Sequence, residues 1–205
     1  MNYKIDQDRL QDICKNCNSP VDYLRGYGRY LSHLLSRLDY GAVGEVIKVF
    51  SQARERDSTI FFVGNGGSAA TASHFSQDLG EVGRKTGGPC FRTLSLTDNV
   101  SFITAMGNDY GYEAIFTGQL SNLFKRGDVL VAISASGKSR NVVQAVKLVK
   151  QLGGITVGLV GFDGGDLLKM CDYVVHVVAN KGEYGPVEDI HLVLDHMITS
   201  YLMWR

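Results

Sequence analysis

The feature that most constrains the fold of this chain is a series of short, apolar, β-rich runs separated by helical segments. Five such runs recur, at 59–63, 92–96, 129–133, 155–160 and 173–178. Their hydrophobicity is continuous rather than alternating, so we expect both faces of each strand to be covered. That pattern is typical of a parallel sheet between two layers of helices. We therefore predict a doubly wound α/β fold with a five-stranded parallel sheet.

The segments around these runs carry apolar residues at helical spacing. They lie at about 20–39, 42–56, 68–80, 100–106, 112–124, 139–152, 164–170 and 187–204. The first of them contains a leucine stripe, formed by Leu31, Leu34, Leu35 and Leu38. This stripe and the largely apolar last helix exceed what one small sheet covers, so we expect part of their surface to be buried between subunits.

No repeat, low-complexity tract or linker divides the chain. We predict a single domain over residues 1–205. Within it, residues 1–57 form N-terminal helices used in oligomerisation, and residues 58–205 form the α/β core and the C-terminal helix.

The composition limits the cellular compartments and the partners to be expected for this chain. Lys+Arg and Asp+Glu both number 21, so no global field attracts nucleic acid or an anionic membrane. The cysteines are scattered and the first ten residues lack the basic-then-apolar run of a signal peptide. No apolar stretch approaches the roughly 18 residues of a membrane helix. We expect a cytoplasmic protein with no nucleic acid and no membrane partner, which binds its ligand in a local site.

The loop 134–139, at the end of the third run, has the composition of a phosphate site. Ser134, Ser136 and Ser139 each offer a hydroxyl, and Gly137 lets the backbone approach a ligand. The helix that follows supplies free N–H groups and a favourable dipole. Neither GxxxxGK[ST] nor GxGxxG is present, which favours a small phosphorylated metabolite over a nucleotide. The alternative is that the serines only cap the helix, although three hydroxyls in six residues exceed what one cap uses.

Two other polar turns follow strands, at 64–68 and 95–99. In open parallel sheets, ligands bind beyond the carboxyl ends of the strands, where such turns run into helix N-termini. We therefore expect these turns and the serine-rich loop to share one edge of the sheet.

A second constellation suits acid–base or metal chemistry. His74 and Asp78 are four residues apart on one helix, and Glu188 and His196 are eight apart on the last helix. Two imidazoles and two carboxylates suit Zn²⁺ or another divalent metal, or a general acid and base.

Two further polar residues of the last helix, His191 and Asp195, are predicted to lie on a different face from that constellation. For any one histidine or carboxylate alone, a hydrogen-bonded core residue or a solvated charge is the more common role. Only convergence of several such side chains in space makes a site.

Several motifs, in the same order, resemble the sugar isomerase (SIS) domain, and most of all its phosphoheptose isomerase branch. They are the GNGGS turn at 64–68, the SLTDN turn at 95–99, the stretch 107–112, the S-x-S-G-x-S loop at 134–139, the stretch 161–165 and the segment 188–191. The resemblance covers nearly the whole chain and implies a flavodoxin-like SIS fold with added N-terminal helices. It implies a homotetramer with sites at subunit interfaces.

The activity implied by this resemblance is an aldose–ketose isomerisation. Such enzymes interconvert D-sedoheptulose 7-phosphate and D-glycero-D-manno-heptose 7-phosphate through an enediolate, with no nucleotide or redox cofactor. The implied substrate-binding residues are Asn65, Gly66, Gly67, Ser68, Asn108, Asp109, Ser134, Ala135, Ser136, Ser139 and Glu188. The implied zinc ligands are His74, Asp78, Glu188 and His196.

The sequence departs from the family at two of these positions. The family's catalytic glutamate falls on Asp78, and its glutamine ligand falls on Glu188. Aspartate is one methylene shorter, and proton transfer requires heavy atoms within about 2.6–3.2 Å. One hypothesis is that the roles have exchanged, with Glu188 as the base and Asp78 as a ligand or orienting group. The catalytic set is then Asp78, Glu188 and His196.

Two non-enzymatic or altered functions remain as alternatives. SIS proteins of similar sequence include a regulator that binds the bacterial replication initiator, and its GNGGSAA loop is close to residues 64–70 here. A sugar-phosphate sensor, or an isomerase for another phosphosugar, also fits the changes at Asp78 and Glu188. The imidazole of His196 favours an enzyme, since a binding module has no need of it.

Overall fold

The computed structural model describes residues 9–205, so most of the segment inspected for a signal peptide lies outside the described residues. At its centre is a five-stranded parallel sheet with the strand order β2-β1-β3-β4-β5. The strands are β1 (Thr59–Val63), β2 (Arg92–Ser95), β3 (Val129–Ser134), β4 (Ile155–Gly161) and β5 (Tyr173–Val177). The predicted doubly wound parallel sheet is confirmed. Its strand order reverses between β1 and β3, which is where such sheets bind ligands.

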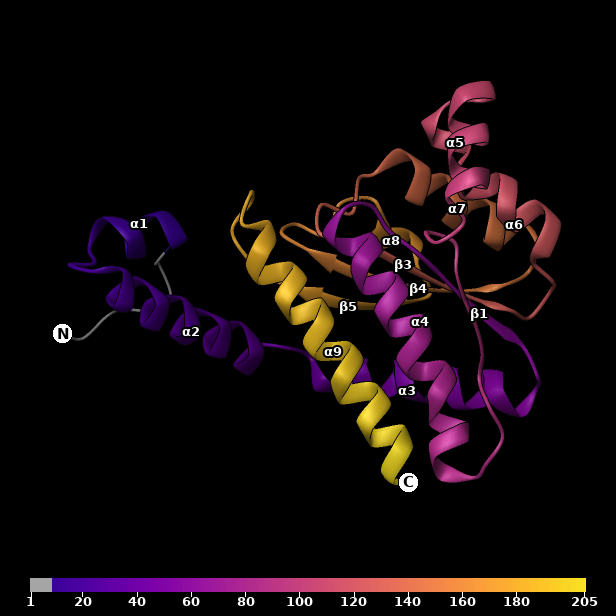
Figure 1. Ribbon diagram of the computed structural model, residues 1–205, viewed down its shortest axis with the longest axis horizontal. Coiled ribbons are helices and arrows are strands. Elements are labelled where there is room, and N and C mark those ends of the chain that lie inside the picture. The colour runs from indigo at the N-terminus through magenta and orange to yellow at the C-terminus, as the bar shows by residue number, and fades with distance from the viewer. Residues whose placement is uncertain (1–8) are drawn as a thin grey trace.

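Most of the helices pack around the sheet, whereas α1 (Leu10–Lys15) and α2 (Pro20–Ser36) extend away from it (Figure 1). The others are α3 (Tyr40–Glu55), α4 (Gly67–Thr86), α5 (Val100–Asp109), η2 (Tyr112–Ala114), α6 (Thr117–Leu123), α7 (Arg140–Gln151), α8 (Leu167–Met170) and α9 (Tyr184–Trp204). Several of the helices differ from the sequence-based prediction. Helix α4 runs past residue 80 and ends at Gly87, which adopts the left-handed conformation of a C-terminal cap. The segment 112–124 divides into η2 and α6, and α1 was not predicted because it buries no residue.

Both faces of the sheet are covered, as the continuous hydrophobicity requires. In β1, Ile60 and Phe62 belong to one apolar core, with residues of α3, α4 and α9. Phe61 and Val63 belong to the other core, with residues of α6 and α7. This alternation follows from the period of two along a strand.

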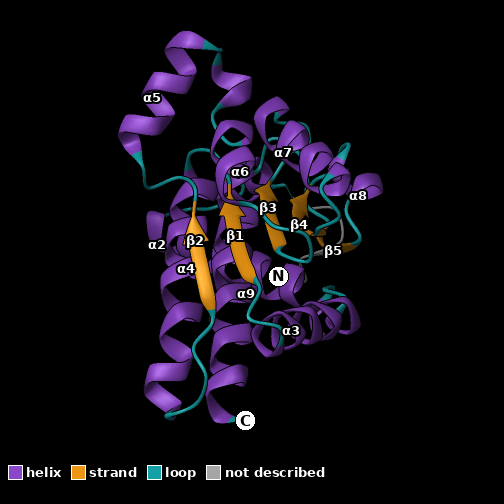
Figure 2. Cartoon of the chain, turned by 90° about the vertical axis from the view of Figure 1, so that its right-hand side faces the viewer, coloured by secondary structure: helices purple, strands orange, loops and turns teal. Residues whose placement is uncertain are grey.

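Aromatic packing fixes α4 on the sheet. Phe75 of α4 lies 5.1 Å from Phe62 of β1 and 5.8 Å from Phe50 of α3, measured between ring centroids. Helices α4 and α9 then lie side by side, and both begin near the carboxyl ends of the strands (Figures 1 and 2). The two helices therefore form a scaffold that begins at the ligand-binding edge.

The leucine stripe at 31–38 packs within the chain. Leu34 and Leu38 are buried, and Leu31 and Leu35 pack against the same core. The exposed apolar surface lies elsewhere, and it includes Trp204 at 83% exposure near the end of α9. Among the helices of residues 9–205, none is long and apolar enough to cross a membrane.

Candidate active site

A cavity of about 140 Å³ lies at the carboxyl ends of β1 and β3. It is lined by Asn65, Ser68, Ile133, Ser134, Ala135, Ser136, Ser139, Tyr184 and Glu188. Seven of these nine were predicted as site residues from the sequence, and the structure brings them together here; Ile133 and Tyr184 were not predicted. The cavity is therefore the meeting point of the loop 64–68, the serine-rich loop and the start of α9.

The serine-rich loop is a tight turn held by its own polar groups. The Gly137 amide donates to the carbonyl of Ser134 at 3.0 Å and to its hydroxyl at 3.2 Å. Gly137 has a φ of +62°, and a β-carbon there would lie 2.0 Å from the carbonyl oxygen of Gly164. Only glycine fits, because the loop 134–139 packs directly on the loop after β4.

The hydroxyl of Ser139 is not used to cap the helix that follows. Ser139 occupies the N-cap position of α7, yet its side chain makes no capping hydrogen bond within the described part of the chain. Its Oγ instead lies 3.3 Å from Oγ of Ser134. The two hydroxyls therefore stand together at the start of α7, where the helix dipole favours an anion.

Asn65 joins the first loop to α7. Its side-chain amide and that of Asn141 exchange two hydrogen bonds, of 2.9 Å and 2.8 Å. The Tyr112 hydroxyl also donates to Asn65 Oδ1, at 2.9 Å. This network fixes the loop 64–68 against the helix that follows the serine-rich loop.

Glu188 enters the cavity from α9. A β-carbon on Gly67 would lie 2.2 Å from Glu188 Oε2, so the absence of a side chain at Gly67 makes room for this carboxylate at the start of α4. Partial burial, and then the charge of Asp189, raise the pKa of Glu188 above its usual range. A raised pKa gives this carboxylate a greater affinity for a proton.

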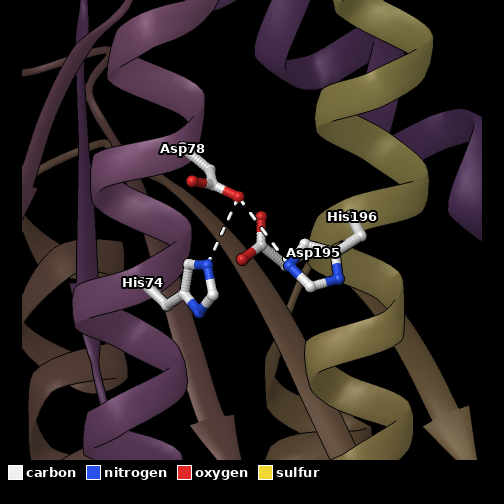
Figure 3. A group of neighbouring side chains, drawn as sticks. All are labelled: His74, Asp78, Asp195 and His196. Atoms are coloured by element: carbon white, nitrogen blue, oxygen red, sulfur yellow. Dashed lines mark ion pairs between the residues drawn. The ribbon is translucent and has the colours of Figure 1, made fainter.

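A second group of side chains lies further along α4 and α9 (Figure 3). His74, Asp78, Asp195 and His196 each offer one ligand atom, and these atoms lie within 4.8 Å of one another. Nε2 of His74 is 3.5 Å from Oδ2 of Asp78, and Nε2 of His196 is 3.9 Å from the same oxygen. The two imidazole rings pack edge to face with centroids 5.2 Å apart. We call these four residues the His–Asp cluster.

The membership of the His–Asp cluster differs from the prediction in one respect. Asp195 belongs to it, although it lies on a different face of α9 from His196 as expected: Asp195 is 0% exposed, whereas the His196 side chain is 55% exposed. The ligand atoms of both residues nevertheless lie within 4.8 Å of those of His74 and Asp78 on α4. Glu188 is not a member of the cluster. It precedes His196 by eight residues, which places it about 12 Å away along the helix.

The environment of Asp195 is unusual for a carboxylate. The residue is 0% exposed, and neither carboxylate oxygen has a hydrogen-bond partner among residues 9–205. Burial, and then the charge of Asp78, raise the pKa of Asp195 to about 7. The four donors together, two imidazole nitrogens and two carboxylate oxygens, are a set that holds a divalent metal such as Zn²⁺.

Comparison with known proteins agrees with this architecture. A model of the SIS domain matches residues 22–161. A phosphoheptose isomerase of Akkermansia muciniphila is 36% identical over 159 residues, which make up 77% of this chain and 82% of that protein. The chain belongs to the phosphoheptose isomerase branch of the SIS domain family.

Solved structures of this branch share the fold. The phosphoheptose isomerase of Neisseria gonorrhoeae gives a TM-score of 0.78 at 30% identity, and the match covers 89% of this chain and 95% of that chain. The phosphoheptose isomerase of Francisella tularensis gives 0.82 at 25% identity, and the match covers 91% and 100%. The family predicted from the motifs is confirmed.

Two predicted substrate residues of this SIS domain lie away from the cavity. Asn108 and Asp109 are exposed at the end of α5, where the Asn108 amide donates to Asp109 at 2.7 Å. Helix α5 stands out beyond the carboxyl ends of the strands (Figure 2). Within one chain, Asn108 and Asp109 therefore do not line the cavity that the serine-rich loop forms.

Besides Ile133, three residues of the site were not predicted from the sequence. Tyr184 lines the cavity and packs edge to face on Phe162, with ring centroids 5.1 Å apart. Asn141 holds Asn65, and Asp195 completes the His–Asp cluster. A polar residue in the otherwise apolar α9 was the available signal for Asp195, whereas Tyr184 and Asn141 carried none.

Proposed function

We propose that this protein is a phosphoheptose isomerase that interconverts D-sedoheptulose 7-phosphate and D-glycero-D-manno-heptose 7-phosphate. The observation that carries the proposal is the cavity in which the serine-rich loop and Glu188 meet at the carboxyl ends of the strands. The named relatives support the same activity. The reaction moves one proton between adjacent carbons and needs no redox cofactor.

In this proposal the serine-rich loop holds the phosphate. Ser134, Ser136 and Ser139 donate hydroxyl hydrogen bonds, and Ala135 gives its backbone N–H. Ser139 supports this proposal because its hydroxyl does not cap α7 and can therefore donate to a phosphate. The loop residues Asn65, Gly66, Gly67 and Ser68 contact the sugar.

Glu188 is the base of the proposed mechanism. It takes the proton from the carbon beside the carbonyl, which gives an enediolate, and the proton is returned to the adjacent carbon. Its raised pKa and its place in the cavity favour this role over that of a metal ligand within its own chain. As a proton acceptor it replaces Asp78, whose side chain is shorter and points into the His–Asp cluster.

The His–Asp cluster is the proposed metal and acid–base centre. His74, Asp78 and His196 would hold Zn²⁺, which when bound stabilises negative charge on a substrate oxygen as a Lewis acid. His196 is also placed to move a proton at a substrate oxygen, and Asp78 orients both imidazoles. Glu188 as a zinc ligand, which the family resemblance implies, remains a prediction for a neighbouring subunit.

We further propose a cytoplasmic homotetramer with sites formed between subunits. Glu188 and the His–Asp cluster lie about 12 Å apart along α9, so a complete site draws on two chains. The exposed apolar side chains of α9, Tyr201 at 47% and Trp204 at 83%, support burial between subunits. A monomer by sedimentation at micromolar concentration would contradict the tetramer. Asn108 and Asp109 would bind sugar hydroxyls from the neighbouring side.

The deciding experiment follows aldose formation from sedoheptulose 7-phosphate, with and without a chelator. We expect turnover by the native protein, and a loss of about 10²- to 10⁴-fold in kcat for Glu188→Gln, which keeps the shape but not the proton affinity. The matched control is Glu45→Gln, the same change at an exposed residue of α3 that does not line the cavity, and it should leave kcat unchanged.

Two outcomes would count against the proposal. A Glu188→Gln rate close to the native one removes Glu188 as the base. Binding of sedoheptulose 7-phosphate without turnover by the native protein, with or without added zinc, supports the sensor or regulator alternative instead.

A further inference from the structure

We propose that Asp195 is a ligand of the divalent cation bound by the His–Asp cluster, together with His74, Asp78 and His196. The inference rests on the metal of the proposed function and names a ligand that the family resemblance does not supply.

The spacing of the donor atoms suits a zinc ion. Ligands on a tetrahedral Zn²⁺ with bonds of about 2.0–2.1 Å are separated by about 3.4 Å. The His74–Asp78 separation is 3.5 Å and the His196–Asp78 separation is 3.9 Å. The Asp195 oxygen lies within 4.8 Å of all three other donor atoms, so a small movement of side chains brings the four around one ion.

The burial of Asp195 calls for a positive partner. The residue is 0% exposed and both of its oxygens lack a hydrogen-bond partner in the described residues. An unpartnered buried carboxylate is costly, and proteins satisfy such groups by pairing or by metal coordination. Because Asp195 is already buried by its own chain, a neighbouring subunit of the proposed tetramer does not reach it.

A cation does have a path to this carboxylate. The side chains of His74 and His196 are 42% and 55% exposed, so an ion enters from solvent between the imidazoles and meets Asp195 behind them. Figure 3 shows the Asp195 carboxylate directed toward the space between Asp78 and His196.

The competing explanation involves His191. This histidine lies one helical turn before Asp195 and is also 0% exposed, and beside its ring lies the backbone of Val160. Rotation of the two side chains into a buried pair would satisfy both without a metal. In that case Asp195 is structural and zinc binding does not depend on it.

The test measures zinc affinity directly, by competition with a chromophoric chelator. We expect Asp195→Asn to weaken Zn²⁺ binding by about 100-fold or more, at the upper end of what loss of a supporting group causes. Asp189→Asn, the same substitution on the same helix outside the His–Asp cluster, should leave the affinity unchanged. Unchanged affinity in folded Asp195→Asn, or no zinc binding by the native protein, overturns the proposal.

A second variant gives a spectroscopic readout. With Co²⁺ as the probe, Asp195→Cys places a thiolate in the ligand set and should produce a thiolate-to-cobalt charge-transfer band that the native protein lacks. Absence of the band in folded protein also overturns the proposal. The measurement stays informative if Asp195→Asn fails to fold.

These readouts separate the ligand assignment from the proposed activity. If the native protein turns over sedoheptulose 7-phosphate and Asp195→Asn binds zinc as tightly, the ligand assignment fails and the function stands. If zinc binding depends on Asp195 but no turnover occurs, the function fails and the ligand assignment stands.

Discussion

Replacing Ser139 by alanine separates phosphate binding from helix capping. Ser139 lines the cavity and occupies the N-cap of α7, but its hydroxyl makes no capping bond in the described structure. Ser19 offers the opposite case, because its hydroxyl accepts from the Asp22 amide at 3.2 Å and caps α2 far from the cavity. Alanine at position 19 therefore removes a helix cap, whereas alanine at position 139 removes a hydroxyl of the cavity.

The expected magnitudes follow from these contacts. A hydrogen bond to a charged group contributes about 1.5–3 kcal/mol, so Ser139→Ala should raise KM for sedoheptulose 7-phosphate by about 10- to 150-fold. Its free energy of unfolding should change by less than about 0.5 kcal/mol, since no cap is lost. Ser19→Ala should lower the free energy of unfolding by about 1 kcal/mol and leave KM unchanged.

Steady-state kinetics and urea unfolding of the two variants provide the assay. The phosphate assignment predicts that Ser139→Ala shifts KM more than kcat, because the phosphate is bound equally in the ground state and the transition state. The reasoning is refuted if Ser139→Ala behaves like Ser19→Ala, with about 1 kcal/mol of lost stability and an unchanged KM.

Two further predictions concern the loops and the thiols. Gly137→Ala should cost about 3 kcal/mol or more in urea unfolding, because its β-carbon would lie 2.0 Å from a backbone oxygen at a φ of +62°. Gly87→Ala is the control: it is left-handed with a φ of +72°, but no atom lies within 4 Å of the added carbon, so about 1–2 kcal/mol is expected. Equal losses in the two variants would contradict the clash. Burial, and then the charge of Asp172, raise the pKa of Cys171 to about 12, so this thiol stays protonated at pH 8. Iodoacetamide at pH 8 should therefore label the exposed Cys90 before Cys171, as followed by mass spectrometry. Labelling of both at equal rates in folded protein would show that Cys171 is not shielded.

The sheet and the serine-rich loop could be predicted because each has a local signal. A strand covered on both faces is expected to be largely apolar, and β3 and β4 are so: β3 is buried along its whole length and β4 from Thr156 to Gly161. The loop 134–139 combines hydroxyls and a glycine directly after such a strand. Helix α1 gave a weaker signal, because it spans only six residues and its apolar residues Leu10 and Ile13 are only partly buried against the core.

The membership of the His–Asp cluster could not be predicted by counting residues along one helix. Residues three or four apart share a face of an isolated helix, and this rule grouped Glu188 with His196 and set Asp195 aside. In the structure the site lies where α4 and α9 meet. The buried Asp195 and the exposed His196, which are adjacent on α9, both contribute to it. Which residues meet in a groove depends on how two helices pack, and neither helix encodes that alone.

The parallel course of α4 and α9 also explains why the two halves of the site are separate in one chain. Gly67 of α4 meets Glu188 of α9 near the strand ends, and His74 meets His196 seven and eight residues later on the same two helices. Each step covers about 10–12 Å, far beyond the roughly 3 Å of a proton transfer. Glu188 and His196 of one chain therefore do not act on the same carbon atom. The proposed tetramer accounts for such a separation, because a neighbouring subunit supplies the second half of each site.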